Sequence, residues 1–246
     1  MAAYQDFAAL YDRLMDDVDY DAWARHYMQL LSLTPKDKVA ELGCGTGEIS
    51  IRLAKAGIPL LATDLSPEMI AIAQEKARKA GAQLNFAVQD MTRFAVPRRV
   101  HAVLCACDGV NYLTDTKQVK ACFARVFEAL RPGGRFAFDI SAPAKLNRMA
   151  GQMYGEDRED VTYLWMNERN DEKKTLEMNL AFFVRQENGF YKRFSERHVQ
   201  RIHEPEELIA LLTEAGFTDI HAYSEMTTES YTAQDERIHF TAVKPQ

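Results

Sequence analysis

Val39-Ala40-Glu41-Leu42-Gly43-Cys44-Gly45-Thr46-Gly47-Glu48 joins an apolar, strand-like run to a helical pattern through three alternate glycines. Glycine adopts φ > 0 easily and, having no Cβ, lets the backbone approach a ligand closely. Glycines spaced between a strand and a helix therefore predict a turn that cradles a nucleotide-like ligand. Asp64 ends the next apolar run and lies 64 − 43 = 21 positions after the first glycine. A carboxylate there can accept hydrogen bonds from both hydroxyls of a ribose.

The position of the third glycine separates two classes of ligand. A dinucleotide turn would carry it at position 48, which is Glu48, whereas this chain carries it at Gly47. The segment resembles motif I of the class I S-adenosylmethionine (SAM) dependent methyltransferases, and Asp64 matches the acidic residue of their second motif. Gln89-Asp90-Met91 resembles the part of that family that reads adenine, and Leu130-Arg131-Pro132-Gly133-Gly134-Arg135-Phe136 resembles its turn into the fifth strand. The likeness covers about residues 37–141 and implies SAM as the cofactor.

Composition and charge narrow the class of protein. The 246 residues are 47% hydrophobic, which suits one large α/β domain or one domain with an insertion. No apolar run is long enough to span a bilayer, and residues 1–6 are neither basic nor continuously hydrophobic, so we expect a cytoplasmic protein with no membrane partner. The net charge of −6 makes nucleic acid an unlikely partner, because such binding usually needs a basic patch. We expect a monomer or a homodimer.

The cysteines indicate core filling rather than chemistry. They fall in predicted strand, turn or helix positions without the pattern of a disulfide framework, and two of them alone cannot make a zinc site, so no metal is expected. They are Cys44, Cys105, Cys107 and Cys122.

Strand and helix patterns alternate through the first 141 residues. Ser66-Pro67 is a strong helix start, because serine caps the first turn and proline suits its first position. Two earlier helices, over 5–17 and from Asp21 as N-cap, predict a helical cap before the sheet. The expected strands are 37–42, 59–64, 83–88, 100–106, 134–140, 217–224 and 238–243. The alternation predicts a doubly wound parallel sheet, and the resemblance implies a seven-stranded Rossmann-like sheet whose last strand is antiparallel.

A different pattern follows residue 141. Segments 161–168, 175–186 and 190–203 read as three consecutive strands of an antiparallel meander, and the polar stretch 151–160 reads as a mobile linker. We therefore expect a SAM-binding core over 1–141 and 204–246 and an inserted subdomain over 142–203. An insertion that leaves the carboxyl edge of the sheet can roof the ligand site.

The resemblance implies a role for each residue around the cofactor. Glu41 would hold the ammonium of SAM, Asp64 the ribose hydroxyls and Asp90 the adenine amino group. The alternatives are purely structural roles: a charged strand end for Glu41 and a turn cap for Asp90. The expected cofactor-binding set is Glu41, Gly43, Cys44, Gly45, Gly47, Asp64, Leu65, Met69, Gln89, Asp90, Met91 and Cys107.

The acceptor side is less defined. Residues 105–112 follow the fourth strand where the methyl group would be presented, but they lack the Asn-Pro-Pro-Tyr or Asp-Pro-Pro-Tyr pattern of many enzymes that methylate nucleobase or glutamine nitrogen. Asp108 could receive a proton from the acceptor or simply shape a turn with Asn111. The catalytic candidates are Asp108, His198 and Tyr11. The substrate-binding candidates are Tyr4, Trp23, Asn111, Tyr112, Arg193 and Arg197. Tyr11-Asp12 and segment 193–198 resemble a bacterial small-molecule methyltransferase subgroup that includes sugar N-methyltransferases.

Strand parity leaves one question open. Arg193, Arg197 and Arg201 share one face of their strand, and Phe194 and His198 share the other. A two-residue turn at Asn188-Gly189 would set the arginines beside the apolar residues of the preceding strand, whereas a three-residue turn would set Phe194 and His198 there. Inward arginines would favour an anionic acceptor. Outward arginines would form a solvated stripe.

The expected activity is SAM-dependent methyl transfer to a small polar metabolite (EC 2.1.1 type). The sulfonium is already activated, so the protein mainly aligns the nucleophile for in-line displacement and excludes water. A base is needed only where the acceptor loses a proton as it reacts. The alternatives are a methyltransferase of tRNA or protein, a SAM-binding regulatory protein without turnover and, more distantly, a nicotinamide oxidoreductase.

Overall fold

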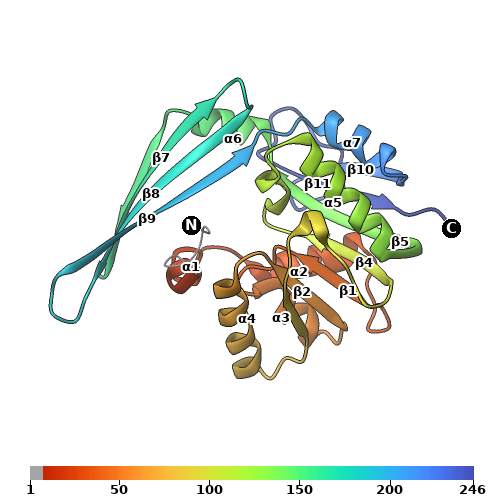
Figure 1. Ribbon diagram of the computed structural model, residues 1–246, viewed down its shortest axis with the longest axis horizontal. Helices are drawn as coiled ribbons and strands as arrows, with labels where there is room; N and C mark the ends of the chain where they lie inside the picture. Colours follow the sequence, from red (N-terminus) through yellow and green to blue (C-terminus); the bar gives the residue numbers. More distant parts are fainter. Residues whose placement is uncertain (1–7) are drawn as a thin grey trace.

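The computed structural model describes residues 8–246. Its core is a seven-stranded sheet in the order β10-β11-β5-β4-β1-β2-β3 (Figure 1). Strands β1 to β5 run parallel to one another. β11 runs antiparallel to β5, and β10 runs antiparallel to β11. The predicted doubly wound sheet with an antiparallel last strand is confirmed. The strands are β1 (Val39–Leu42), β2 (Leu60–Asp64), β3 (Asn85–Val88), β4 (Val100–Cys105), β5 (Leu130–Ser141), β10 (Thr218–Ser224) and β11 (Arg237–Val243).

Helices cover both faces of this sheet. They are α2 (Tyr20–Leu30), α3 (Glu48–Lys55), α4 (Pro67–Ala80), α5 (Thr116–Ala129) and α7 (Pro205–Glu214). The helix start at Ser66-Pro67 is confirmed, because the Ser66 hydroxyl accepts from the Met69 N–H at 3.2 Å. The predicted N-cap Asp21 is wrong. Asp19 caps α2 through the Ala22 N–H at 2.9 Å, while Asp21 lies in the first turn and pairs with Arg52.

Two apolar clusters hold the helices to the sheet. One joins α5 and α7 to β5 and β11 and contains a stack of buried phenylalanines, with the rings of Phe138 and Phe240 at 4.8 Å. The other joins α2 and α3 to β1 and β4. Cys105 and Cys122 are fully buried in the first cluster, where they act as apolar filling. None of the helices in residues 8–246 is long and apolar enough to cross a membrane.

The insertion after β5 is a separate four-stranded antiparallel sheet that extends away from the core as an arm (Figure 1). Its elements are α6 (Pro143–Met149), β6 (Met153–Asp157), β7 (Val161–Asn170), β8 (Thr175–Arg185) and β9 (Tyr191–Arg201). The expected linker 151–160 is wrong, since β6 pairs with β7 from Met153 opposite Met166 to Asp157 opposite Thr162. Every residue of β6 is exposed. A polar edge strand gains backbone hydrogen bonds without burying side chains, so the apolar pattern gave no sign of this fourth strand.

The register of β8 and β9 settles the orientation of the meander. Phe182 lies opposite Phe194, and Met178 lies opposite His198, as the three-residue turn requires. Gly189 takes φ 81° in that turn. The inner face of the insertion therefore carries aromatic and apolar side chains. They pack on Met69 of α4, on α6 and on the short helix α1 (Ala8–Leu14), which lies beneath the insertion (Figure 1).

Candidate active site

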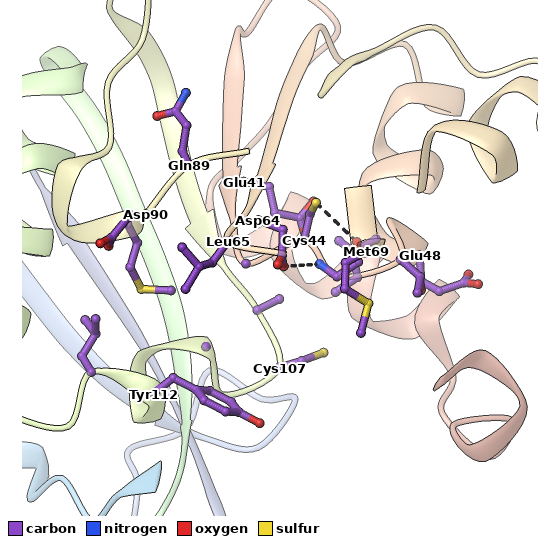
Figure 2. A pocket seen from close by; sticks show the side chains of 18 of the residues that line it. Glu41, Cys44, Glu48, Asp64, Leu65, Met69, Gln89, Asp90, Cys107 and Tyr112 are labelled. Atoms are coloured by element: carbon purple, nitrogen blue, oxygen red, sulfur yellow. Dashed lines mark hydrogen bonds between the residues drawn. The ribbon is translucent and has the colours of Figure 1, made fainter. Parts of the chain in front are cut away.

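A pocket of about 270 Å³ opens at the carboxyl ends of β1, β2 and β4 (Figure 2). Eleven of the twelve residues expected to bind a cofactor line it; Gly47 does not. Besides these residues and Tyr112, the pocket is lined by Tyr20, Thr46, Glu48, Ile49, Thr92, Ala106, Gly109, Leu113 and Gln118. Those near the glycine turn are neighbours of predicted residues, whereas Gln118 comes from a helix distant in sequence and carried no motif.

The glycine turn combines two physical requirements. Gly45 takes φ 54°, and a Cβ built there would meet no heavy atom of the protein within 4 Å, so its backbone faces open space. Gly47 takes φ 81°, and its Cβ would stand only 3.0 Å from the Cβ of Ala73 in α4. Gly47 therefore serves close packing between α3 and α4 and does not line the pocket, while Gly43 and Gly45 do.

Asp64 ends β2 and orders the turn. Its Oδ2 accepts from the Gly45 N–H and its Oδ1 from the Ser66 N–H, both at 2.8 Å. Burial raises the pKa of Asp64, and these backbone hydrogen bonds oppose the rise. Each carboxylate oxygen has a further lone pair with which to accept from a hydroxyl. Next to it, the side chain of Leu65 is 68% exposed, an apolar surface that a flat aromatic ligand could cover.

Glu41 is a buried acid on the pocket. The residue is 2% exposed, and the Ser50 hydroxyl donates to its carboxylate. Burial raises its pKa to about 8, the Ser50 hydrogen bond opposes this, and the charge of Asp64 adds to it. A buried carboxylate without a cation is unfavourable, so this position is suited to a ligand that brings a positive group.

Gln89, Asp90 and Met91, the residues expected beside adenine, all line the pocket. Asp90 caps the 3₁₀ turn Met91–Arg93, since its Oδ1 accepts from the Thr92 N–H and hydroxyl at 2.8 Å. The expected alternative, a turn cap, is therefore present, and Asp90 lines the pocket at the same time. Gln89 also forms local hydrogen bonds with Ala95. The side chains of these residues stand beyond Leu65 as seen from the glycine turn (Figure 2).

The pocket is acidic. The charged side chains among its lining residues are Glu41, Glu48, Asp64 and Asp90, and no lysine or arginine of the described chain lines it. Glu48 pairs with Lys76 and Arg52, which lower its pKa against the effect of burial. Lys76 also binds Asp12 of α1 at 2.6 Å. The arrangement favours a cationic ligand.

Tyr112 and Cys107 lie on the side of the pocket opposite Glu41 (Figure 2). The Tyr112 hydroxyl is 3.4 Å from Nδ1 of His198, which comes from β9. Burial lowers the pKa of His198 to about 4, so its imidazole is neutral at pH 7. The structure thus brings a predicted substrate residue and a predicted catalytic residue together where the pocket meets the insertion.

Four other acceptor-side candidates are not on the pocket. Asn111 is fully buried and bonded to backbone of Ser141 and Arg201, which makes it structural. Trp23 is 9% exposed and belongs to the core, where the centre of its ring lies 5.1 Å from Cζ of Arg237. Arg193 and Arg197 lie on the outer face of the insertion; the three-residue turn places them there.

Two tyrosines and one aspartate complete the expected set. Tyr4 lies outside the described residues, and the side chain of Tyr11 is likewise not described. Asp108 does not line the pocket, although its neighbours Cys107 and Gly109 do. Both of its carboxylate oxygens are engaged, one by Arg237 at 3.0 Å and one by Gln200 at 2.6 Å.

These residues fit SAM. Asp64 presents a carboxylate to a diol, Glu41 offers a buried carboxylate to an ammonium, and Gly45 leaves backbone open to the ligand. Pyrophosphate, by contrast, would meet four acidic side chains and no lysine or arginine of the pocket lining that the structure describes. The site is therefore suited to a cationic nucleoside rather than to a dinucleotide.

Comparisons with known proteins agree with a SAM-binding site. A family model described as "Methyltransferase domain" matches residues 39–134. "Putative methyltransferase YqeM" of Bacillus subtilis (strain 168) is 35% identical over 244 residues, covering 98% of this chain and 97% of the relative. A solved S-adenosylmethionine-dependent methyltransferase from Clostridium acetobutylicum ATCC 824 is 30% identical, with a TM-score of 0.88 over 99% of both chains.

A more distant structure shares the fold alone. The sugar N-methyltransferase KedS8 from Streptoalloteichus sp ATCC 53650 has a TM-score of 0.79 at 20% identity, covering 100% of this chain and 95% of that chain. One assignment follows from the glycine turn, from the acids Glu41 and Asp64 and from the full-length similarity to known methyltransferases. The chain belongs to the class I SAM-dependent methyltransferases.

Proposed function

We propose that the protein methylates a small polar metabolite with SAM, an activity of the EC 2.1.1 type. The observation that carries the proposal is the acidic pocket at the carboxyl edge of the sheet, bordered by Tyr112 and adjoining the insertion. Basic side chains that would bind phosphates of tRNA are missing from the described pocket lining, and the chain has a net charge of −6. The core over 1–141 and 204–246 would supply the donor site, and the insertion over 142–203 would border the acceptor.

Within this proposal the cofactor residues keep the roles that the family resemblance implies. Glu41 binds the ammonium, Asp64 the ribose hydroxyls, and Asp90 with the Met91 N–H the adenine edge. Bound SAM supplies an electrophilic methyl group, which passes to a lone pair of the acceptor while the C–S electrons stay on sulfur. The protein then has to align the acceptor and exclude water.

The acceptor would lie near Tyr112 and His198. A neutral imidazole can accept a hydrogen bond from an acceptor N–H or O–H. A pKa of about 4 makes His198 a weak base at pH 7, so orientation of the acceptor is its main contribution, and the departing proton passes finally to water. The outward position of Arg193 and Arg197 removes the expected reason for an anionic acceptor.

The test is a comparison of acceptor classes. Purified protein is incubated with SAM and, separately, with pools of small amines and hydroxylated metabolites, with bulk tRNA and with denatured protein, and S-adenosylhomocysteine is measured by mass spectrometry. We expect product with a small-molecule pool and at least about tenfold less product from Asp64→Ala at the same sub-saturating SAM concentration. Product with tRNA or protein alone would overturn the acceptor class. A protein that binds SAM and gives no product with any pool would indicate the regulatory alternative.

A further inference from the structure

The turn after β4 has an unusual backbone. Cys107 takes φ 55° and Asp108 takes φ 54°, so two consecutive residues with side chains are in the left-handed region. Such a conformation is disfavoured and persists only where surrounding contacts over-determine it. Cys107 and Gly109 on this turn line the pocket, which makes the turn part of the pocket wall. Its position therefore bears directly on the SAM site.

Asp108 is the anchor of the turn. Its N–H donates to Oδ2 of Asp139 in β5 at 2.9 Å, and its Oδ1 accepts from Arg237 of β11 at 3.0 Å. Arg237 also pairs with Asp139, whose Oδ1 accepts from the Tyr27 hydroxyl at 2.7 Å. Asp139 is fully buried, so this network is shielded from water and its electrostatic interactions are strong.

The remaining oxygen of Asp108 is held from outside the core. Its Oδ2 accepts from Nε2 of Gln200 at 2.6 Å, and Gln200 belongs to β9 of the insertion and is 4% exposed. The residues after Gln200 make further contacts with the residues after Asp108. The Arg201 carbonyl accepts from Asn111 at 2.9 Å, and the ring of His203 is hydrogen-bonded to the Val110 carbonyl at 3.2 Å. The 3₁₀ turn Gly109–Tyr112, which follows Asp108, places Tyr112 on the pocket.

We propose that Gln200 is a positioning residue of the methyl-transfer site, which holds the strained Cys107–Asp108 turn against the SAM pocket from the insertion. The proposal rests on the SAM-dependent activity assigned above. Without the Gln200 amide, one carboxylate oxygen of the partly buried Asp108 loses its donor, and the turn relaxes towards ordinary backbone angles. Cys107 then leaves its place on the wall. This side chain couples the insertion directly to the Cys107–Asp108 turn.

The test follows the Cys107 thiol. Cys107 is the partly exposed cysteine of the four, whereas Cys44, Cys105 and Cys122 are buried. Burial raises the pKa of the Cys107 thiol, so loosening of the turn should accelerate its reaction with iodoacetamide. Gln200→Met keeps the length of the side chain and removes the donor. Gln186→Met is the matched control, because Gln186 is exposed at the hairpin tip and its side-chain amide donates to the nearby Val184 carbonyl, far from the pocket in sequence and fold.

We expect Gln200→Met to raise the alkylation rate of Cys107 about tenfold and to weaken S-adenosylhomocysteine binding by about the same factor, as loss of one hydrogen bond to a carboxylate implies. Gln186→Met should change neither. Cys122 reports global opening and should stay slow in both variants. A wild-type Cys107 rate in Gln200→Met, or a rise shared by Cys122, would overturn the positioning role.

A second variant covers failure of the first to fold. Asp108→Asn keeps a side chain that tolerates the left-handed region and removes the charge that Arg237 and Gln200 hold. We expect the same selective acceleration at Cys107, and its absence would again overturn the proposal. If the wild-type protein failed to bind S-adenosylhomocysteine, the donor assignment would fall, while the alkylation rates of the unliganded proteins would still decide the role of Gln200.

Discussion

The buried acid Glu41 makes cofactor binding depend on pH. Burial raises the pKa of Glu41 to about 8, so the carboxyl group of the free protein is mostly protonated at pH 7. A ligand ammonium pairs with the ionised form only, and binding must therefore release a proton. The sign follows: lowering the pH below 8 weakens binding, because more of the free protein holds the proton that the complex lacks.

The size of the effect follows from the ionised fraction. With a pKa of about 8, that fraction is about 0.24 at pH 7.5 and about 0.01 at pH 6.0. The affinity for S-adenosylhomocysteine should thus fall about 25-fold between these two values, or about 1.9 kcal/mol. The range stays below pH 8 because a ligand α-amino group itself loses its proton near there.

Isothermal titration calorimetry measures both the affinity and the proton. At pH 7, titrations in phosphate and in Tris should differ in apparent enthalpy by the amount that corresponds to release of about one proton. Glu41→Gln should bind more weakly than wild type at pH 7.5 and should lose most of the pH dependence. An affinity of the wild-type protein that is constant from pH 6.0 to 7.5 would refute the pairing of Glu41 with the ligand ammonium.

Three further predictions concern other parts of the molecule. Asp64→Ala should weaken S-adenosylhomocysteine binding by about 10- to 100-fold, as loss of hydrogen bonds to a charged group implies, and circular dichroism should show a folded protein; an unchanged affinity would contradict its role. Between pH 7 and 5 the free energy of unfolding should fall, because burial lowers the pKa of His198, His203 and His239 to about 4 and the unfolded chain binds protons first. Each histidine contributes about 2 kcal/mol to the fall, and the raised pKa of Glu41 offsets part of it. Denaturant titration at both pH values measures the change, and equal stabilities would contradict the prediction. Arg197→Ala should change turnover less than twofold, since Arg197 lies on the outer face with Glu177; a tenfold loss in an SAM conversion assay would contradict that placement.

Local signals were sufficient to bring most of the predicted cofactor residues to one pocket. The glycine turn, Asp64 and Asp90 are short segments whose geometry depends on the strand that precedes each of them, and parallel strands bring their carboxyl ends to one edge. That rule placed eleven of twelve predicted residues on one pocket. Gly47 is the exception, because the same left-handed backbone serves helix packing as well as ligand approach, and spacing does not distinguish the two.

The acceptor side depended on distant contacts. Trp23 was a candidate as a residue of the N-terminal helices, yet it packs against Arg237 from the far end of the chain. Asn111 was a candidate because it follows the fourth strand, yet backbone carbonyls of β5 and β9 accept from its amide. Neither partner is near in sequence, so no periodicity or motif could have indicated them.

The order of residues 37–141 was enough to predict the doubly wound fold, because each element has a recognisable local pattern and right-handed crossovers leave few topologies. The methyl donor followed from the resemblance of the motifs in that range to a known family. The side of the insertion that faces the core was beyond local pattern. A slip of one residue exchanges the two faces of a strand, and the choice came from packing Phe182 and Phe194 onto α1, α4 and α6. Arg193 and Arg197 are left exposed on the other face, while Arg201 is buried there and pairs with Glu207. The fourth strand β6 and the Gln200–Asp108 contact likewise exist only through segments that meet after folding.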